Sequence, residues 1–104
     1  MKSYRLSDFA DEDLLSIFLY TIEKWGEDQV PVYLGLLDQA FAQLVANPFA
    51  IGSKSRDDLA IRCRVFKAGH HVVFYRPEEE FIAIARILHE SMDFEKHVAE
   101  EHFP

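Results

Sequence analysis

Six basic side chains in the second half of the sequence are of the types that recognise phosphate or carboxylate groups. Arginine binds these anions through a planar fork of donors, and histidine can act as a general acid or base near neutral pH. The expected strands of this region would lie side by side, so the six side chains could converge on one face. They are Arg62, Arg64, His71, Arg76, Arg86 and His89.

Arg86 and His89 are the most informative pair, because the arginine interrupts an otherwise apolar strand and the histidine follows at its exit. Together they could perform acid and base chemistry on an RNA 2′-hydroxyl, with the arginine stabilising charge on the phosphate. Two structural roles are equally open. Arg86 could pair with an acid on the first helix, and His89 could cap the strand.

The other arginines have simpler explanations. Arg62 and Arg64 recur at a spacing of two, which predicts that both lie on the solvated face of one strand. Arg76 precedes the acidic run 78–80, where ion pairs across a turn contribute little energy. We therefore expect these residues to be surface groups rather than catalytic residues.

Several other chemistries are disfavoured. His70 and His71 are adjacent on a strand and point to opposite faces, while His97 and His102 lack a helical i, i+4 relation, so the sequence predicts no metal site and no cofactor. It also has no glycine-rich phosphate loop, paired cysteines or serine-hydrolase motif. The single Cys63 falls in an apolar pattern and is predicted to be an inert buried thiol.

Charge is distributed unevenly along the 104 residues, whose net charge is −7. Residues 1–53 carry −5, residues 54–76 carry +4 and residues 77–104 carry −6. The overall sign disfavours autonomous binding to nucleic acid. No apolar run approaches the roughly 20 residues of a membrane helix, and the start of the chain lacks a secretion signal, so we expect a single cytoplasmic domain over residues 1–104.

Two helices are predicted in the first half, after a short strand at 4–6. Ser7 or Asp8 would cap the first helix and Gly26 would end it. Pro31 is compatible with the first turn of the second helix, which ends at Asn47-Pro48. The first apolar stripe comprises Ala10, Leu14, Ile17, Phe18, Thr21 and Trp25, and the second comprises Tyr33, Leu34, Leu37, Phe41, Leu44 and Val45; both predict core packing, including that of Trp25 and Tyr33.

Three strands are predicted in the second half. Alternation predicts a strand at 59–65, Gly69 breaks the chain before a strand at 70–76, and a turn at 77–80 leads into a central strand at 81–88. Ser91 or Asp93 would cap a short helix that ends near Glu101. The sequence therefore predicts an α+β fold: an N-terminal strand and an antiparallel two-helix hairpin packed on a small antiparallel sheet, which a three-stranded C-terminal meander completes.

The residues also match a family in ordered positions along almost the whole chain, and the sequence resembles the ParE toxins of the RelE/ParE superfamily of type II toxin-antitoxin modules. The resemblance implies the fold described above. It rests on Tyr-Arg-Leu-Ser at 4–7, Ala10, Asp13-Leu14, Trp25-Gly26, Gln29, Tyr33-Leu34, Phe41, Leu44, Asn47-Pro48, Gly52, Arg62, Phe66, Gly69-His70, Val72-Val73-Phe74-Tyr75, Arg86-Ile87-Leu88-His89 and Ser91-Met92-Asp93.

The resemblance implies a non-enzymatic growth inhibitor that acts on DNA gyrase by stabilising its cleaved DNA complex. A ParD-like antitoxin would neutralise it in a hetero-oligomer. Candidate antitoxin contacts are Leu14, Phe18, Tyr33 and Leu37; candidate gyrase contacts are Arg62, Arg64, His71, Arg86, His89 and Met92.

The first alternative is a ribosome-dependent mRNA endoribonuclease of the RelE type, which would use Arg64, Arg86 and His89. The sequence departs from such relatives where their catalytic arginine is replaced by His71 and where a tyrosine beyond the histidine is replaced by Glu90. A second alternative is an inactive protein that keeps the toxin fold only as a binding module.

Overall fold

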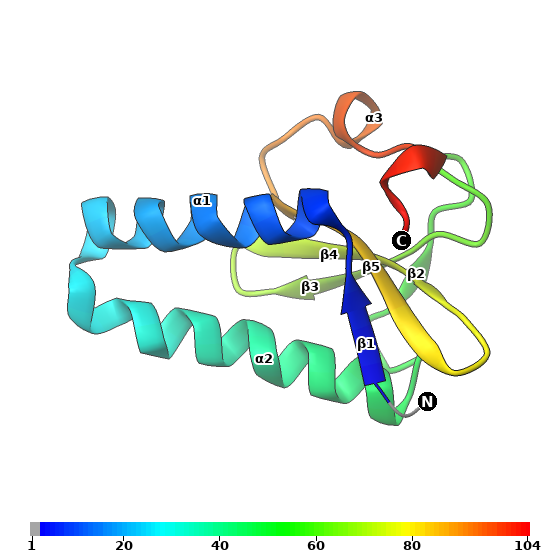
Figure 1. Cartoon of the computed structure of the whole chain (residues 1–104), viewed down its shortest axis with the longest axis horizontal. Helices are drawn as coiled ribbons and strands as arrows, with labels where there is room; N and C mark the ends of the chain where they lie inside the picture. Colours follow the sequence, from blue (N-terminus) through cyan, green and yellow to red (C-terminus); the bar gives the residue numbers. More distant parts are fainter. Residues whose placement is uncertain (1–2) are drawn as a thin grey trace.

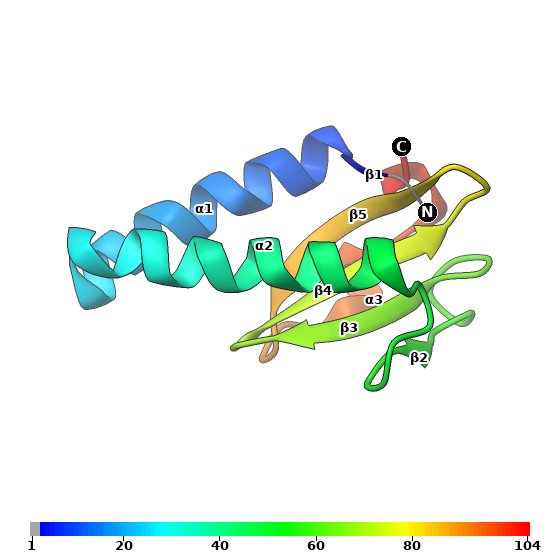
Figure 2. The same ribbon diagram turned by 90° about the horizontal axis from the view of Figure 1, so that it is seen from below.

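A twisted five-stranded sheet carries a long helix hairpin on one face and a short C-terminal segment on the other (Figures 1 and 2), in a computed structural model that describes residues 3–104. The strand order is β1-β5-β4-β3-β2. The elements are β1 (Ser3–Leu6), α1 (Asp8–Trp25), a 3₁₀ turn (Glu27–Gln29), α2 (Val30–Ala46), β2 (Lys54–Ser55), β3 (Arg64–Ala68), β4 (His71–Pro77), β5 (Phe81–His89), α3 (Phe94–His97) and a second 3₁₀ turn (Glu100–His102).

The predicted helix hairpin is confirmed, together with the residues that delimit it. The Ser7 hydroxyl accepts a hydrogen bond from the Ala10 amide at 2.9 Å and caps α1. Gly26 ends that helix with a φ of 93°, a conformation that glycine adopts without strain. Pro31 lies in the first turn of α2, where its missing N–H leaves no helical hydrogen bond unmade.

The far end of the hairpin projects beyond the sheet (Figures 1 and 2). For this reason the prediction that Trp25 packs in the core is wrong: its side chain is 65% exposed at the end of α1. Residues nearer the sheet behave as predicted, because Ala10, Ile17 and Leu37 are buried in the main core. The apolar stripe of α1 has the predicted helical period, but the sheet is too short to cover the whole stripe.

The C-terminal meander is also confirmed, since β4 pairs antiparallel with both β3 and β5. The N-terminal strand differs from the prediction of an antiparallel sheet. β1 pairs with β5 in parallel, with Ser3 opposite Phe81 and Leu6 opposite Ile84. Residues 7–80 connect these two strands, and β5 is an interior strand, as predicted, because it pairs with β1 on one side and β4 on the other.

The strand predicted at 59–65 is wrong over its first five residues. Residues 57–62 form turns, and β3 begins only at Arg64. Arg62 has a φ of 57°, which no strand residue adopts. The apolar residues of this segment do not alternate between two faces of a strand: Ala60 and Cys63 are buried within turns, while Ile61 is exposed.

A register shift in the β4–β5 ladder exchanges the two faces of β5. Phe74 pairs with Arg86 but Tyr75 pairs with Ile84, so β5 contains one extra residue at this point. Ile84 before the irregularity and Ile87 after it therefore both face the helices and belong to the main core. Without the shift, the apolar residues that follow would point to the opposite face.

Where β1 ends, Ser7 and Asp13 form further hydrogen bonds to the backbone of β5. The Ser7 amide donates to the Ile84 carbonyl at 3.0 Å, and the Ser7 hydroxyl donates to the Ala85 carbonyl at 2.6 Å. One carboxylate oxygen of Asp13 accepts the Ile87 amide at 2.9 Å. Backbone groups of an interior strand are thus satisfied by a helix cap and a side chain.

A second, smaller core lies on the sheet face away from the hairpin. It contains Cys63, Phe74 and Leu88, with Phe94 and Phe103 packed against it from the C-terminal segment. Asp93 caps α3 as one of the two predicted alternatives, but the helix ends at His97 rather than near Glu101. The remaining C-terminal residues cover the second core as a 3₁₀ turn.

Candidate functional site

A groove runs between α1 and the end of β5, and it collects four of the six residues proposed from the sequence as gyrase contacts. We call it the α1–β5 groove. Its volume is about 510 Å³, and it shares Tyr20, His71 and His89 with a neighbouring cavity of about 210 Å³. The four residues are His71, Arg86, His89 and Met92, and the remaining wall is formed by Asp13, Ser16, Ile17, Tyr20, Ile87, Leu88, Ser91 and His97.

His71 connects the sheet to the second helix. It is the first residue of β4 and is 7% exposed, and its Nδ1 atom lies within hydrogen-bond distance of the Tyr33 hydroxyl of α2. The same hydroxyl accepts the His70 amide at 3.1 Å. Burial, and next the neighbouring His89 and His70, lower the pKa of His71 to about 4, so this ring is neutral at physiological pH.

His89 forms the local turn at the strand exit that the sequence suggested. Its Nδ1 atom accepts the Ser91 amide at 3.1 Å and lies 2.8 Å from the Ser91 hydroxyl. Close by, Glu90 bridges His70 and Lys67, and these hydrogen bonds lower the pKa of Glu90 to about 2. The side chains at the exit of β5 therefore form an ordered polar turn, in which the His89 ring is already hydrogen-bonded.

Arg86 pairs with an acid on the first helix, as one of the two sequence interpretations proposed. Its Nε and Nη2 atoms each donate to an Asp13 carboxylate oxygen at 2.8 Å, and Nη1 donates to the His97 carbonyl at 2.9 Å. The hydrogen bond to Asp13 is the main reason why the pKa of Arg86 is raised. This arginine ties α1, β5 and the C-terminal segment together.

Arg62 and Arg64 lie in a different cavity, lined also by Phe49, Ser55, Asp57 and Pro77. They do not share a strand face, because Arg62 is in a turn. Arg62 donates to the Pro77 carbonyl and to Glu78, whereas Arg64 donates to the Ser53 hydroxyl at 2.9 Å and stacks over Phe49. The expected convergence of all six basic residues on one face therefore does not occur.

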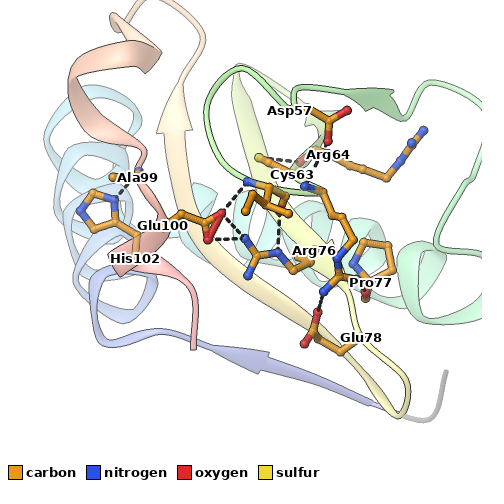
Figure 3. A network of polar contacts seen from close by, with 11 residues as sticks. Asp57, Cys63, Arg64, Arg76, Pro77, Glu78, Ala99, Glu100 and His102 are labelled. Atoms are coloured by element: carbon orange, nitrogen blue, oxygen red, sulfur yellow. Dashed lines mark hydrogen bonds and ion pairs between the residues drawn. The ribbon is translucent and has the colours of Figure 1, made fainter.

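The prediction that Arg76 pairs with the adjacent glutamates is wrong. Arg76 makes two hydrogen bonds of 2.8 Å to Glu100 and donates to the Ile61 carbonyl (Figure 3). Its guanidinium group also stacks on the Phe103 ring. The partner of Glu78 is instead Arg62. Because the side chain of Arg76 leans over the second core, it reaches the C-terminal segment rather than its sequence neighbours.

The four candidate antitoxin contacts differ in exposure. Phe18 is 37% exposed, whereas Leu14 and Tyr33 are half-buried and pack against the main core. Leu37 is 1% exposed, so its side chain is not at the surface. Other large apolar residues of the two helices are exposed as well: Leu15, Leu19 and Trp25 on α1, and Val32 and Leu36 on α2.

Gly69, in the β3–β4 turn, has a φ of 61° and lies against Tyr33. A Cβ atom there would lie 2.9 Å from the Tyr33 hydroxyl oxygen, which its two hydrogen bonds hold in place. We expect Gly69→Ala to lower the free energy of unfolding by about 2 kcal/mol, measured by urea denaturation. As a control, Gly35→Ala within α2 meets nothing within 4 Å and should stabilise by about 1 kcal/mol. Equal effects of the two substitutions would contradict this prediction.

Two general features of residues 3–104 bear on the kind of site. No group of three or more histidine, cysteine, aspartate or glutamate side chains among them could hold a metal ion together. None of the helices in this part of the chain has the length and apolar character needed to cross a membrane. The α1–β5 groove itself is lined by both polar and apolar side chains.

Comparisons with known proteins agree with this fold. Residues 4–94 match the family described as the ParE toxin of the type II toxin-antitoxin system parDE. Toxin ParE1 of Caulobacter vibrioides is 37% identical over 94% of this chain and 99% of its own. Toxin ParE of Escherichia coli is 36% identical over 96% of each chain.

A solved structure, the chromosomal ParDE TA system from P. aeruginosa, aligns with 86% of this chain and 96% of its own at 20% identity, with a TM-score of 0.68. At that identity the likeness concerns the fold, and it agrees with the hairpin and sheet described above. The sequence matches extend over nearly the whole chain and the predicted resemblance is confirmed. This chain therefore belongs to the ParE toxin family of type II toxin-antitoxin systems.

Proposed function

We propose that this toxin arrests growth without enzymatic activity, by binding DNA gyrase in the cytoplasm and stabilising its cleaved DNA complex, and that a ParD-like antitoxin neutralises it. The proposal rests on membership of the ParE family over residues 4–94. The geometry of the basic residues adds independent support, because it disfavours the main alternative.

The observation that carries the non-enzymatic proposal is the engagement of Arg86. An arginine that stabilises a phosphate must offer donors to that phosphate, but three nitrogens of Arg86 already donate to Asp13 and His97. Arg64 lies in another cavity, so the three residues of the nuclease alternative do not share a site. Without an available arginine beside it, His89 has no cation to stabilise the charge that develops on the phosphate during RNA cleavage.

The α1–β5 groove is the surface that we propose for gyrase. It combines the exposed side chain of Met92 with His89 and the polar exit of β5. Apolar and polar groups arranged together on an ordered surface are suited to holding a protein partner. Arg62 and Arg64 line a separate cavity. We therefore propose the α1–β5 groove as the principal contact with gyrase.

Gyrase inhibition is tested with purified toxin, gyrase, plasmid DNA and ATP. We expect cleaved DNA to accumulate with toxin, and Met92→Glu to reduce that accumulation. An absence of any effect on cleavage or supercoiling would contradict the proposal. If primer extension on translated messages instead shows cuts that His89→Ala abolishes, the chain is a nuclease; binding to antitoxin without growth arrest would identify an inactive binding module.

The antitoxin is proposed to cover the exposed apolar side of α1. Leu15, Phe18 and Leu19 recur at helical spacings of three and four, which makes them neighbours on the surface. An amphipathic helix binds such a stripe through its own apolar face. Because the first 53 residues carry −5, basic residues flanking the apolar face of the partner would strengthen the complex.

We expect Leu19→Lys to abolish co-purification with the antitoxin encoded beside the toxin gene, since it places a charge in the apolar contact. Ile51→Lys is the matched control, because Ile51 is fully exposed in the turn after α2. Retention of the complex by Leu19→Lys, or its loss in Ile51→Lys, would contradict this assignment of the surface.

A further inference from the structure

The register of the sheet brings together two histidines that are 18 positions apart in the sequence. His71 on β4 lies directly opposite His89 on β5. Their ring centroids are 5.3 Å apart and the ring planes cross at 85°. Two imidazoles bound to one tetrahedral zinc ion at normal Zn–N distances have their centroids about 5 Å apart, so this separation already suits a shared ion.

Each of the two rings also has the outer partner that a metal-bound histidine needs. A ring that binds a metal through Nε2 carries its proton on Nδ1 and donates it to a neighbouring oxygen. For His71 that oxygen is the Tyr33 hydroxyl, and for His89 it is the Ser91 hydroxyl, 2.8 Å away. No other described residue hydrogen-bonds the Nε2 atom of either ring.

Solvent can reach the pair, because both rings line the α1–β5 groove and the adjoining cavity. The surroundings are favourable to a cation as well. The chain has a net charge of −7, and a negative net charge raises the concentration of cations near a protein.

We propose that His71 and His89 form a two-histidine binding site for Zn²⁺, each binding through Nε2, with water in the remaining coordination positions. Binding through Nε2 requires the proton of the His89 ring to lie on Nδ1, so the Ser91 amide contact that Nδ1 accepts in this structure is exchanged for donation to the Ser91 hydroxyl.

The site does not depend on the proposed action on gyrase. Its direct consequence is structural, because an ion held by both strands would join the ends of β4 and β5. A ligand that binds only the folded state raises the melting temperature in a concentration-dependent manner. The adjacent His70 provides a control: it lines the same cavity, but its ring stacks on His89 at 6.4 Å and its Nδ1 atom is hydrogen-bonded to Glu90.

The site is tested by titrating ZnCl₂ into the untagged, ¹⁵N-labelled protein while imidazole nitrogen signals are followed by NMR. We expect the Nε2 signals of His71 and His89 to shift together, with Nδ1–H as the final tautomer of both, and the melting temperature to rise. Unchanged Nε2 signals of these two rings at zinc concentrations in large excess would overturn the proposal.

Two variants test whether zinc binds to His71 and His89 and not to another histidine. We expect His89→Ala to weaken zinc binding by at least about tenfold and His70→Ala to leave it unchanged, as measured by calorimetric titration. His89→Ala retains the hydrogen bond between His71 and Tyr33, so a folded protein is expected. Equal affinity of wild type and His89→Ala, or an equal loss in His70→Ala, would overturn the two-histidine assignment.

Discussion

Replacing Arg86 with methionine is expected to lower the free energy of unfolding by about 3 kcal/mol, because removing one partner of a largely desolvated ion pair leaves the other charge uncompensated. The side chains of Arg86 and Asp13 are 16% and 12% exposed, and their two hydrogen bonds measure 2.8 Å. The substitution also removes the bond to the His97 carbonyl, which holds the C-terminal segment. Urea denaturation with linear extrapolation measures the change.

Arg62→Met is the matched control for this prediction. Arg62 pairs with Glu78 at 2.9 Å, but its side chain is largely exposed, so solvent screens the pair. An exposed ion pair of this kind contributes at most about 1 kcal/mol. If the two variants were equally stable, the Arg86–Asp13 pair would not have the structural role assigned to it.

Cys63 is expected to be almost unreactive toward maleimide while the protein is folded. Its side chain is fully buried in the second core, and burial raises the pKa of its thiol from 9.0 to about 12. Three pKa units correspond to about a thousandfold less thiolate at a mildly alkaline pH, and the thiolate is the reactive form. Labelling followed by mass spectrometry, with and without urea, measures the ratio of rates.

A cysteine two residues away tests whether burial is the cause. Ile61 is exposed in the same turn, so the double variant Cys63→Ala/Ile61→Cys is expected to react at nearly the rate of an unfolded thiol. Rapid labelling of Cys63 in the folded wild type would contradict the prediction. In Arg86→Met, faster labelling of Cys63 would report looser packing of the C-terminal segment.

Much of the fold could be predicted because its signals are local. The cap at Ser7, the stop at Gly26 and the proline in the first turn of α2 act through hydrogen bonds within a few residues. The strands β4 and β5 were recognisable as apolar runs on either side of an acidic turn. By contrast, the alternation at 59–63 has the period of a strand, but these residues form turns with local backbone hydrogen bonds and a positive φ at Arg62.

The candidate site was less predictable, because its residues meet through long-range packing. The sequence suggested that Arg86 could pair with an acid on the first helix, but the choice of Asp13 depends on where α1 begins along β5. The basic residues were expected to converge on one face. The turn at Arg62 and the reach of Arg76 to Glu100 instead place them at separate positions.

By itself the sequence determined the helix hairpin, the C-terminal meander, the burial of Cys63 and the ParE pattern, since each follows from periodicity, capping or ordered residue types. The tertiary structure alone decided the parallel pairing of β1 and the exposure of Trp25. It also decided which charges and rings meet, including the opposition of His71 and His89. The physical reason is that strand register and edge pairing are set by the whole sheet, whereas sequence periodicity reports only which side of an element is apolar.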